Sequence, residues 1–199
     1  MSRKIEVEVF TFAELSDDAK ECAREWYREG IQFDANDTIE CTIVDAAKLL
    51  GITIDRPRGA RTGYAVDWDT NPVGAAFVGS WRASDVKPGA LVKEFPRDAT
   101  LAVIARDLEA VAAEFPDAYA NCDTGRGCFQ RVEAYAEAGE DSDDCGDDVA
   151  QLVVDSLTSF AHWIGCTIAA EMEYQFSEEC VDESIEANGY EFTADGEAY

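Results

Sequence analysis

The hydrophobic pattern changes its period along the chain, and each change predicts a separate element. From Ile5 to Phe10, apolar and acidic side chains alternate, which is typical of a half-buried strand. A helix is expected from Ser16, because a serine N-cap followed by acidic residues suits a helix start. Gly30 is expected to end that helix. Its predicted apolar face consists of Ala19, Cys22, Ala23, Trp26 and Tyr27.

Two further segments of the first 131 residues have a helical period. Residues 37–50 carry apolar side chains three and four positions apart, and Gly51 is expected to terminate the helix. Residues 98–114 repeat the pattern and stop before Pro116. Both segments predict helices that bury one face.

Strands are predicted between and after these helices. Residues 64–68 and 75–81 are rich in alternating aromatic and small apolar residues around a turn, which predicts a hairpin. Residues 52–55 are expected to form a short strand or connector, and residues 129–136 the last strand.

The C-terminal part predicts helices separated from the rest by an acidic linker at 137–148. A long helix is expected over 149–174 and a short acidic one over 178–187. The weakly charged stretch 149–170 is long enough for a membrane span, but its polar residues favour a buried helix instead. The expected inward face is Val149, Val153, Phe160, Trp163 and Ile164.

Together these elements predict an α+β fold, with a small antiparallel sheet of three to four strands packed with about four to five helices. The length of 199 residues and the 47% hydrophobic content predict a single domain over 1–199 with a strongly acidic helical segment at 137–199. No secretion signal is recognised at the start, and seven irregularly spaced cysteines indicate reduced, mostly buried thiols. The expected location is the cytoplasm of a host cell.

Charge is segregated along the sequence. The chain has 42 acidic and 16 basic side chains, a net charge of −26, and no lysine or arginine follows Arg131. Residues 132–199 hold 19 of the acidic side chains. Such a field repels nucleic acid and anionic lipid and accelerates encounter with a basic surface. A basic protein partner is therefore expected, without direct nucleic-acid or membrane binding. Adaptation to high salt is the alternative, and it predicts acid spread evenly.

Two acidic clusters are the candidate partner-binding residues. Each carboxylate would take the place of a phosphate oxygen opposite lysine or arginine. Within the second cluster, four residues at i, i+3, i+4 and i+7 spacing form one acidic stripe on a helix. The first cluster is Asp141, Asp143, Asp144, Asp147 and Asp148, and the second is Glu178, Glu179, Asp182, Glu183 and Glu186. The stripe is Glu179, Asp182, Glu183 and Glu186.

Catalytic motifs do not emerge from the sequence. His162 is the only histidine, it falls on the polar side of its predicted helix, and no nucleophile elbow or Walker loop occurs. We therefore expect no enzymatic activity and no cofactor. The acidic run from Asp141 resembles a calcium loop but has Cys145 and Leu152 at two ligand positions. Cys122, Cys128 and Cys145 lack the spacing typical of a zinc site.

One basic cluster interrupts this acidic chain. Arg56, Arg58 and Arg61 surround a proline and a glycine, and they lack a phosphate-binding glycine pattern. A solvated loop that balances nearby acid is favoured over a small anion site.

Three segments resemble an acidic protein family found in phages and prophages. They are FAELSDDAKECAREWY from Phe12, GAAFVGSWRASD from Gly74 and SEECVDESIEANGYEF from Ser177. Some members of that family are labelled antitoxin of a toxin–antitoxin stability system. In relatives the hairpin reads F-W-S-Q-G-D-G-A-x-F-x-G, whereas residues 68–79 keep the ends and change the polar centre. The resemblance supplies no catalytic residues.

A phage setting suggests a function for the acidic surface. Phages use small acidic proteins to block nucleic-acid-handling defence machinery, and this chain resembles them in size and charge. We therefore expect an anti-CRISPR-like inhibitor of a CRISPR effector or restriction enzyme, which fills a basic groove as a DNA mimic. The alternatives are an antitoxin that neutralises a basic toxin and a salt-adapted protein without a mimic role.

Overall fold

The chain forms two compact units in the computed structural model. Unit 1 comprises residues 1–35 and 170–199, and unit 2 comprises residues 36–169. The sequence predicted one domain, whereas the contacts between residues divide the chain into two units. One long helix contributes residues to both units. The structure describes residues 8–33, 37–56, 58, 62–70, 73–125, 130–135 and 146–199.

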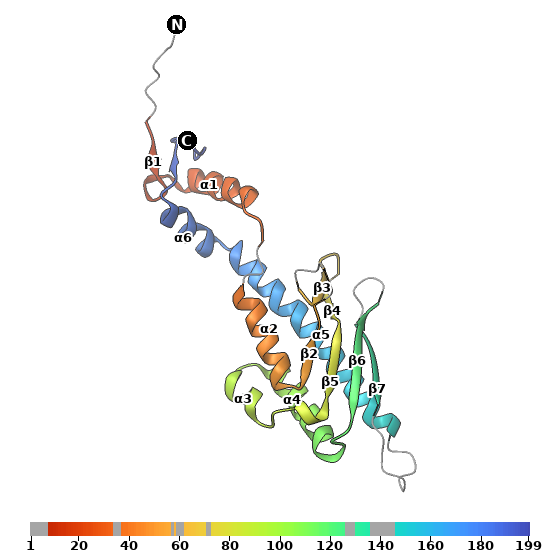
Figure 1. The fold of residues 1–199 in the computed structure, drawn as a ribbon. Helices are drawn as coiled ribbons and strands as arrows, with labels where there is room; N and C mark the ends of the chain where they lie inside the picture. Colours follow the sequence, from red (N-terminus) through yellow and green to blue (C-terminus); the bar gives the residue numbers. More distant parts are fainter. Residues whose placement is uncertain are drawn as a thin grey trace. The chain divides into compact units, whose positions relative to one another are not determined.

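Unit 2 contains a four-stranded antiparallel sheet in the order β2-β5-β6-β7 (Figure 1). The strands are β2 (Ile52–Ile54), β5 (Gly79–Arg82), β6 (Tyr119–Thr124) and β7 (Gln130–Tyr135). One face of the sheet is apolar: Ile52 lies opposite Trp81 and Trp81 opposite Ala120, and all three are buried. The other face carries polar side chains, as the period of two requires. An α+β fold with a small antiparallel sheet is confirmed.

The predicted hairpin exists, but its second strand is divided. β3 (Tyr64–Asp67) pairs with β4 (Gly74–Phe77), whereas β5 leaves them to pair with β2 and β6. The prediction of one strand over 75–81 is therefore wrong at Val78. Gly79 permits the close approach of β5 to β2, because a Cβ atom there would lie 1.9 Å from the carbonyl oxygen of Thr53.

The helices of unit 2 follow the predicted apolar periods. α2 (Asp37–Leu49) ends before Gly51, which has a φ of +76° that favours glycine. Of the residues expected to face inward, Ile43, Ala46 and Ala47 of α2 and Leu50 after it are buried, whereas Ile39 is half-buried. α4 (Ala99–Glu114) is capped by Asp98, the first residue of the predicted helix, whose side chain accepts from the backbone N–H of Leu101. Two short helical segments, η2 (Ala83–Asp85) and α3 (Ala90–Glu94), precede α4.

The long helix α5 (Gly146–Gln175) is a core element of unit 2. Val153, Phe160, Trp163 and Ile164 are buried as predicted, whereas Val149 is half-buried. Phe160 meets Phe77 of β4 edge to face, with 5.7 Å between ring centroids. By length and composition alone, α5 is the one helix of the described residues that could cross a membrane, and half of its apolar window is buried inside the protein.

Unit 1 is built from the two ends of the chain. β1 (Phe10–Thr11) pairs antiparallel with β8 (Glu191–Phe192), and a short 3-10 turn, η1 (Phe12–Glu14), leads into α1 (Asp17–Gly30). α6 (Glu178–Asn188) completes the unit. Its buried core is Phe12, Leu15, Ala19, Ala23, Val181, Ile185 and Phe192.

Two strand predictions differ from the structure, one for the first strand of the chain and one for the last. β1 begins at Phe10, the last residue of the predicted strand, and residues 5–7 lie outside the described part. Residues 129–136 contain β7, but β8 follows it and is the last strand in the chain. Two residues are too few to show a period of two, so the sequence pattern does not predict β8. Its pairing with β1, at the other end of the chain, identifies it as a strand.

Candidate functional site

Acidic charge concentrates in unit 1. Residues 8–33 and 170–199 carry 17 acidic and three basic side chains, a net charge of −14. Unit 2 is twice as long and has a net charge of −12. The segregation seen along the sequence is therefore also a segregation in space, with the N-terminal acids of α1 joining those of α6 in one unit.

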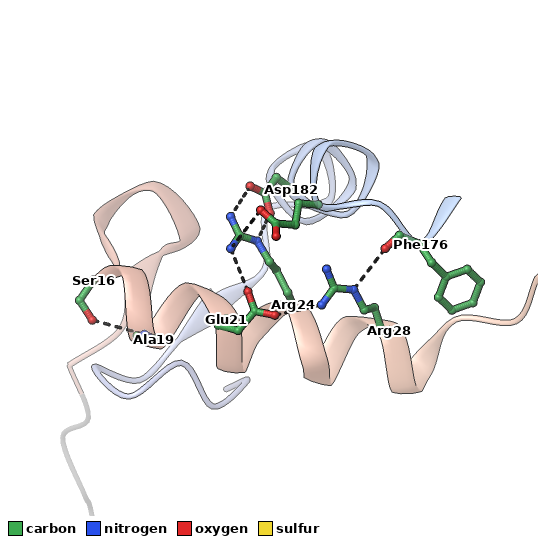
Figure 2. A network of polar contacts seen from close by, with 8 residues as sticks. Ser16, Ala19, Glu21, Arg24, Arg28, Phe176 and Asp182 are labelled. Atoms are coloured by element: carbon green, nitrogen blue, oxygen red, sulfur yellow. Dashed lines mark hydrogen bonds and ion pairs between the residues drawn. The ribbon is translucent and has the colours of Figure 1, made fainter. Parts of the chain in front are cut away.

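Arg24 of α1 forms ion pairs with carboxylates of α6. Its Nε lies 2.7 Å from Oδ1 of Asp182 and its second guanidinium nitrogen 2.8 Å from Oδ2, a bidentate pair (Figure 2). The remaining nitrogen donates to Glu21 at 3.1 Å and lies 3.9 Å from Glu178. These carboxylates raise the pKa of Arg24, with the Asp182 hydrogen bonds the largest cause. Ser177, the N-cap of α6, fixes the helix start beside this pair.

The other two cations of α1 are also occupied. Arg28 donates from Nε to the carbonyl oxygen of Phe176 at 3.3 Å and pairs with Glu21 at 3.1 Å (Figure 2). The ammonium of Lys20 lies over the ring of Phe12, 5.6 Å from its centroid. The pKa of Glu21 is lowered by the hydrogen bonds from Arg24 and then Arg28. Within the described residues of unit 1, ion pairs involve only three of the 17 carboxylates.

The predicted acidic stripe is divided by these contacts. Asp182 faces α1 and pairs with Arg24, whereas Glu179, Glu183 and Glu186 are exposed. Glu178 is also largely exposed, although it approaches Arg24. Asp182 is thus already neutralised within the unit, and three carboxylates of the stripe remain open to a partner.

Tyr174 lies close enough to this exposed acidic surface for its pKa to be affected. Its side chain is exposed at the end of α5 in unit 1, and its pKa is raised by the neighbouring Cys180 and then by Glu183, with smaller contributions from Glu179 and Glu171. A raised phenol pKa means that another negative charge is unfavourable there.

The first predicted cluster is only partly described. Asp141, Asp143 and Asp144 lie outside the described residues, whereas Asp147 and Asp148 are exposed in the first turn of α5. These two residues belong to unit 2. The two predicted clusters therefore belong to different units, and unit 1 holds the second.

A cluster of aromatic side chains accompanies the acids of unit 1 and was missed from the sequence. Trp26 contacts Tyr190, Phe192 and Tyr27, with 5.2, 5.7 and 6.4 Å between ring centroids. Trp26 was predicted to be part of a buried face, but 39% of it is exposed, and so is 38% of Tyr190. The sequence signal was the aromatic pair near the C-terminus, which a helical period does not connect to α1.

The structure also shows where the side chains considered for catalysis and metal binding lie. His162 is exposed, as predicted, and its Nε2 lies 3.5 Å from Sγ of Cys166 one turn along α5. No group of three or more histidine, cysteine or acidic residues that could hold a metal occurs among the described residues. A groove of about 360 Å³ in unit 2 lies between α4 and α5 and is lined by both apolar side chains, such as Val103 and Leu152, and polar ones, such as Asp107 and Asp155.

The cysteines depart from their predicted burial. Cys22, Cys41 and Cys166 are exposed free thiols, so the prediction of mostly buried thiols is wrong for the described part. Cys22 is a small side chain at the edge of the apolar face of α1, where burial is not required. Cys122 in β6 is buried, which raises its thiol pKa to about 12. Cys128 and Cys145, the other predicted zinc candidates, lie outside the described residues.

The arginine cluster is likewise only partly described. Arg56 pairs with Glu40 of α2, Arg58 is exposed, and Arg61 lies outside the described residues. An arginine that already holds a carboxylate fits the predicted solvated loop better than an anion site.

Comparison with known proteins leaves the fold and the charges as the guides to function. No protein-family model, no curated protein and no solved structure matches this chain.

Proposed function

We propose that this protein is an acidic inhibitor from a phage or prophage that binds a basic, nucleic-acid-handling protein of a bacterial host. The observation that carries this proposal is the charge of unit 1. Its described residues, 8–33 and 170–199, hold 17 carboxylates against three cations, and each of these three cations has a partner inside the unit. The exposed carboxylates therefore act on whatever approaches from outside.

Carboxylates on a folded surface can replace phosphates in a basic groove. Duplex DNA presents one negative charge per roughly 1.7 Å of its axis, and lysine and arginine recognise carboxylate and phosphate oxygens by the same charge-assisted hydrogen bonds. Glu179, Glu183 and Glu186 recur along one side of α6, so their side chains form a row. We assign this row to the contact with the partner; Asp147 and Asp148 of α5, in unit 2, are a separate candidate contact.

Adaptation to high salt explains the charge distribution less well. It predicts acid over the whole surface, whereas the net charge per residue in unit 1 is more than twice that in unit 2. Like charges at i and i+4 also destabilise an isolated helix by a few tenths of a kcal/mol per pair. A local excess that costs stability is more readily explained by a local partner.

The test is capture of host proteins by the full chain, at low and high salt and with competing DNA. The informative variant replaces Glu179, Glu183 and Glu186 by Gln and keeps Asp182, since Asp182 holds α1 and α6 together. A matched control makes the same charge change on exposed positions of unit 2, with Glu94→Gln, Glu114→Gln and Asp117→Asn.

We expect the wild type and the control to retain one nucleic-acid-binding complex that salt or DNA displaces, and to inhibit its activity. The α6 variant should lose both properties. Capture of a small toxin encoded beside this gene would favour the antitoxin instead. Equal loss in both variants would reduce the effect to net charge, and no salt-sensitive capture at all would contradict the proposal.

A further inference from the structure

The aromatic cluster of unit 1 combines exposure with a fixed arrangement. Trp26 projects from α1, Tyr190 follows α6, and Phe192 of β8 lies beneath with no exposed surface. The Trp26 ring is nearly perpendicular to those of Tyr190 and Phe192, at 81° and 84°. An indole held by several rings loses little conformational freedom when a partner covers it.

The surroundings of this cluster are anionic. Glu29 lies three positions after Trp26 on α1, so the two side chains share one face of the helix, and Glu191 directly follows Tyr190. The basic residues of α1 do not cover the indole: Lys20 and Arg24 lie near the Phe12 ring, and Arg28 bonds to the carbonyl oxygen of Phe176. Among the described residues of the unit, the indole therefore has no cation over it.

We infer that Trp26 and Tyr190 form the anchor for an arginine side chain of the basic partner, with exposed carboxylates of unit 1 around it. This inference rests on the proposed function, because that function supplies a basic partner. The chemistry selects arginine. A guanidinium stacks on an aromatic face and is attracted by its negative potential, and tryptophan attracts cations most strongly of the aromatic side chains. Tryptophan, tyrosine and arginine are also the residues that most often dominate interface energies.

The charge of the unit excludes the other occupants. Nucleic acid and anionic lipid are repelled by a net charge of −14, and a second copy of the same acidic unit is repelled as well. A purely apolar segment would lose the electrostatic attraction that the surrounding acids provide. An arginine-rich protein segment satisfies both the rings and the carboxylates.

The experiment measures binding of a deca-arginine and a deca-lysine peptide to the full chain by calorimetry over a range of salt. The test variants are Trp26→Phe and Trp26→Leu, and the matched control is Trp68→Leu, at an exposed tryptophan of unit 2. Tyr190→Leu removes the second ring and leaves the sequence of α1 unchanged. Circular dichroism and melting curves identify variants in which unit 1 stays folded.

We expect Trp26→Leu to weaken deca-arginine binding about tenfold, with Trp26→Phe intermediate and Trp68→Leu unchanged. Deca-lysine should lose less. The slope of affinity against salt should stay unchanged, because no charge is removed. If Trp26→Leu unfolds unit 1, Trp26→Phe and Tyr190→Leu take its place. Weaker deca-arginine binding by these two variants supports the anchor, and unchanged binding overturns it.

Two results separate the inference from the function on which it rests. Equal binding of both peptides by wild type, Trp26→Leu and Tyr190→Leu would overturn the anchor and leave an acidic inhibitor without it. Failure of the wild type to bind either peptide at low salt would overturn the proposed function as well. A dimer of the free protein that Trp26→Leu dissociates would show that a second copy covers the rings, and would also overturn the anchor.

Discussion

Arg24 and Asp182, separated by 158 positions in the sequence, form a two-pronged ion pair with nitrogen–oxygen distances of 2.7 and 2.8 Å. The Arg24 side chain is 16% exposed and that of Asp182 30%. The pair joins α1 to α6 where the two ends of the chain meet. In a unit with so much negative charge, this arginine offsets the repulsion between the two helices.

The first prediction concerns this pair. Asp182→Asn should destabilise unit 1 by about 1–2 kcal/mol, because a partly buried, bidentate charged hydrogen bond is worth more than an exposed ion pair. Arg24→Gln should cost more, since Glu178 also loses its cation and Glu21 loses one of its two arginine partners. Urea unfolding of both single variants and of the double variant measures the coupling between the two residues. A coupling energy near zero would show that the pair does not hold the helices together.

The second prediction concerns the C-terminal segment. Gly196 has a φ of +86°, and a Cβ atom there would lie 2.0 Å from the carbonyl oxygen of Ala19. Gly196→Ala should therefore cost about 3 kcal/mol or more, from backbone strain and overpacking together. Gly189 is a matched control, because its φ of +65° is similar but nothing lies within 4 Å of the added atom.

Gly189→Ala should cost about 1–2 kcal/mol, the strain alone. Thermal melting of both variants by circular dichroism gives the comparison. Equal costs would mean that residue 196 does not pack against α1, and the tail would then contribute little to unit 1.

The third prediction follows from the lowered pKa of Glu21, which is caused by the hydrogen bonds from Arg24 and Arg28. A carboxyl group with a lower pKa in the folded state stabilises the fold above its unfolded pKa of about 4.3. That contribution is lost as the pH falls through the folded pKa. The melting temperature of the wild type should therefore fall more steeply below about pH 4.5 than that of Glu21→Gln.

Melting curves of the wild type and Glu21→Gln from pH 7 to pH 3 measure this difference. The wild type should be the more stable protein at pH 7, and the two curves should approach each other at the acid end. A constant gap over the whole range would assign the effect to packing of the side chain and not to its charge.

Local signals in the sequence predicted the longer helices, whereas the five-residue helix α3 was not predicted. Ser16 caps α1 as expected, and Gly51 follows α2 with a positive φ. The strands were harder, since their partners are distant. β6 was missed because Ala120 and Cys122 are small inward residues that give a weak period of two, and its pairing with β5 supplies what the sequence pattern does not.

The candidate site was predictable as a charge but not as a surface. The concentration of acid after Arg131 is visible in the sequence, whereas the pairing of Asp182 with Arg24 requires the ends of the chain to meet. The same meeting brings Trp26 to Tyr190. Both relationships depend on the α1 and α6 contact, which no local pattern encodes.

The last prediction concerns Asp98, which bonds with both carboxylate oxygens. Oδ1 accepts from the backbone N–H of Leu101 at 2.9 Å and caps α4, while Oδ2 accepts from Nε1 of Trp163 on α5 at 2.7 Å. Asp98→Ala should cost about 2–3 kcal/mol, since the cap is lost and a nearly buried indole N–H keeps no acceptor. Ser16→Ala, which removes the N-cap of α1, should cost about 1 kcal/mol.

Urea unfolding compares the two cap variants, and Asp98→Asn tests the mechanism. Its amide offers one acceptor oxygen, so it can keep the cap or the indole bond but not both, and its cost should fall between those of the other two variants. Trp163→Phe removes the donor, and in that background Asp98→Ala should cost only the cap. If Asp98→Ala costs no more than Ser16→Ala, then Asp98 acts as a cap alone and α4 is held to α5 by apolar packing.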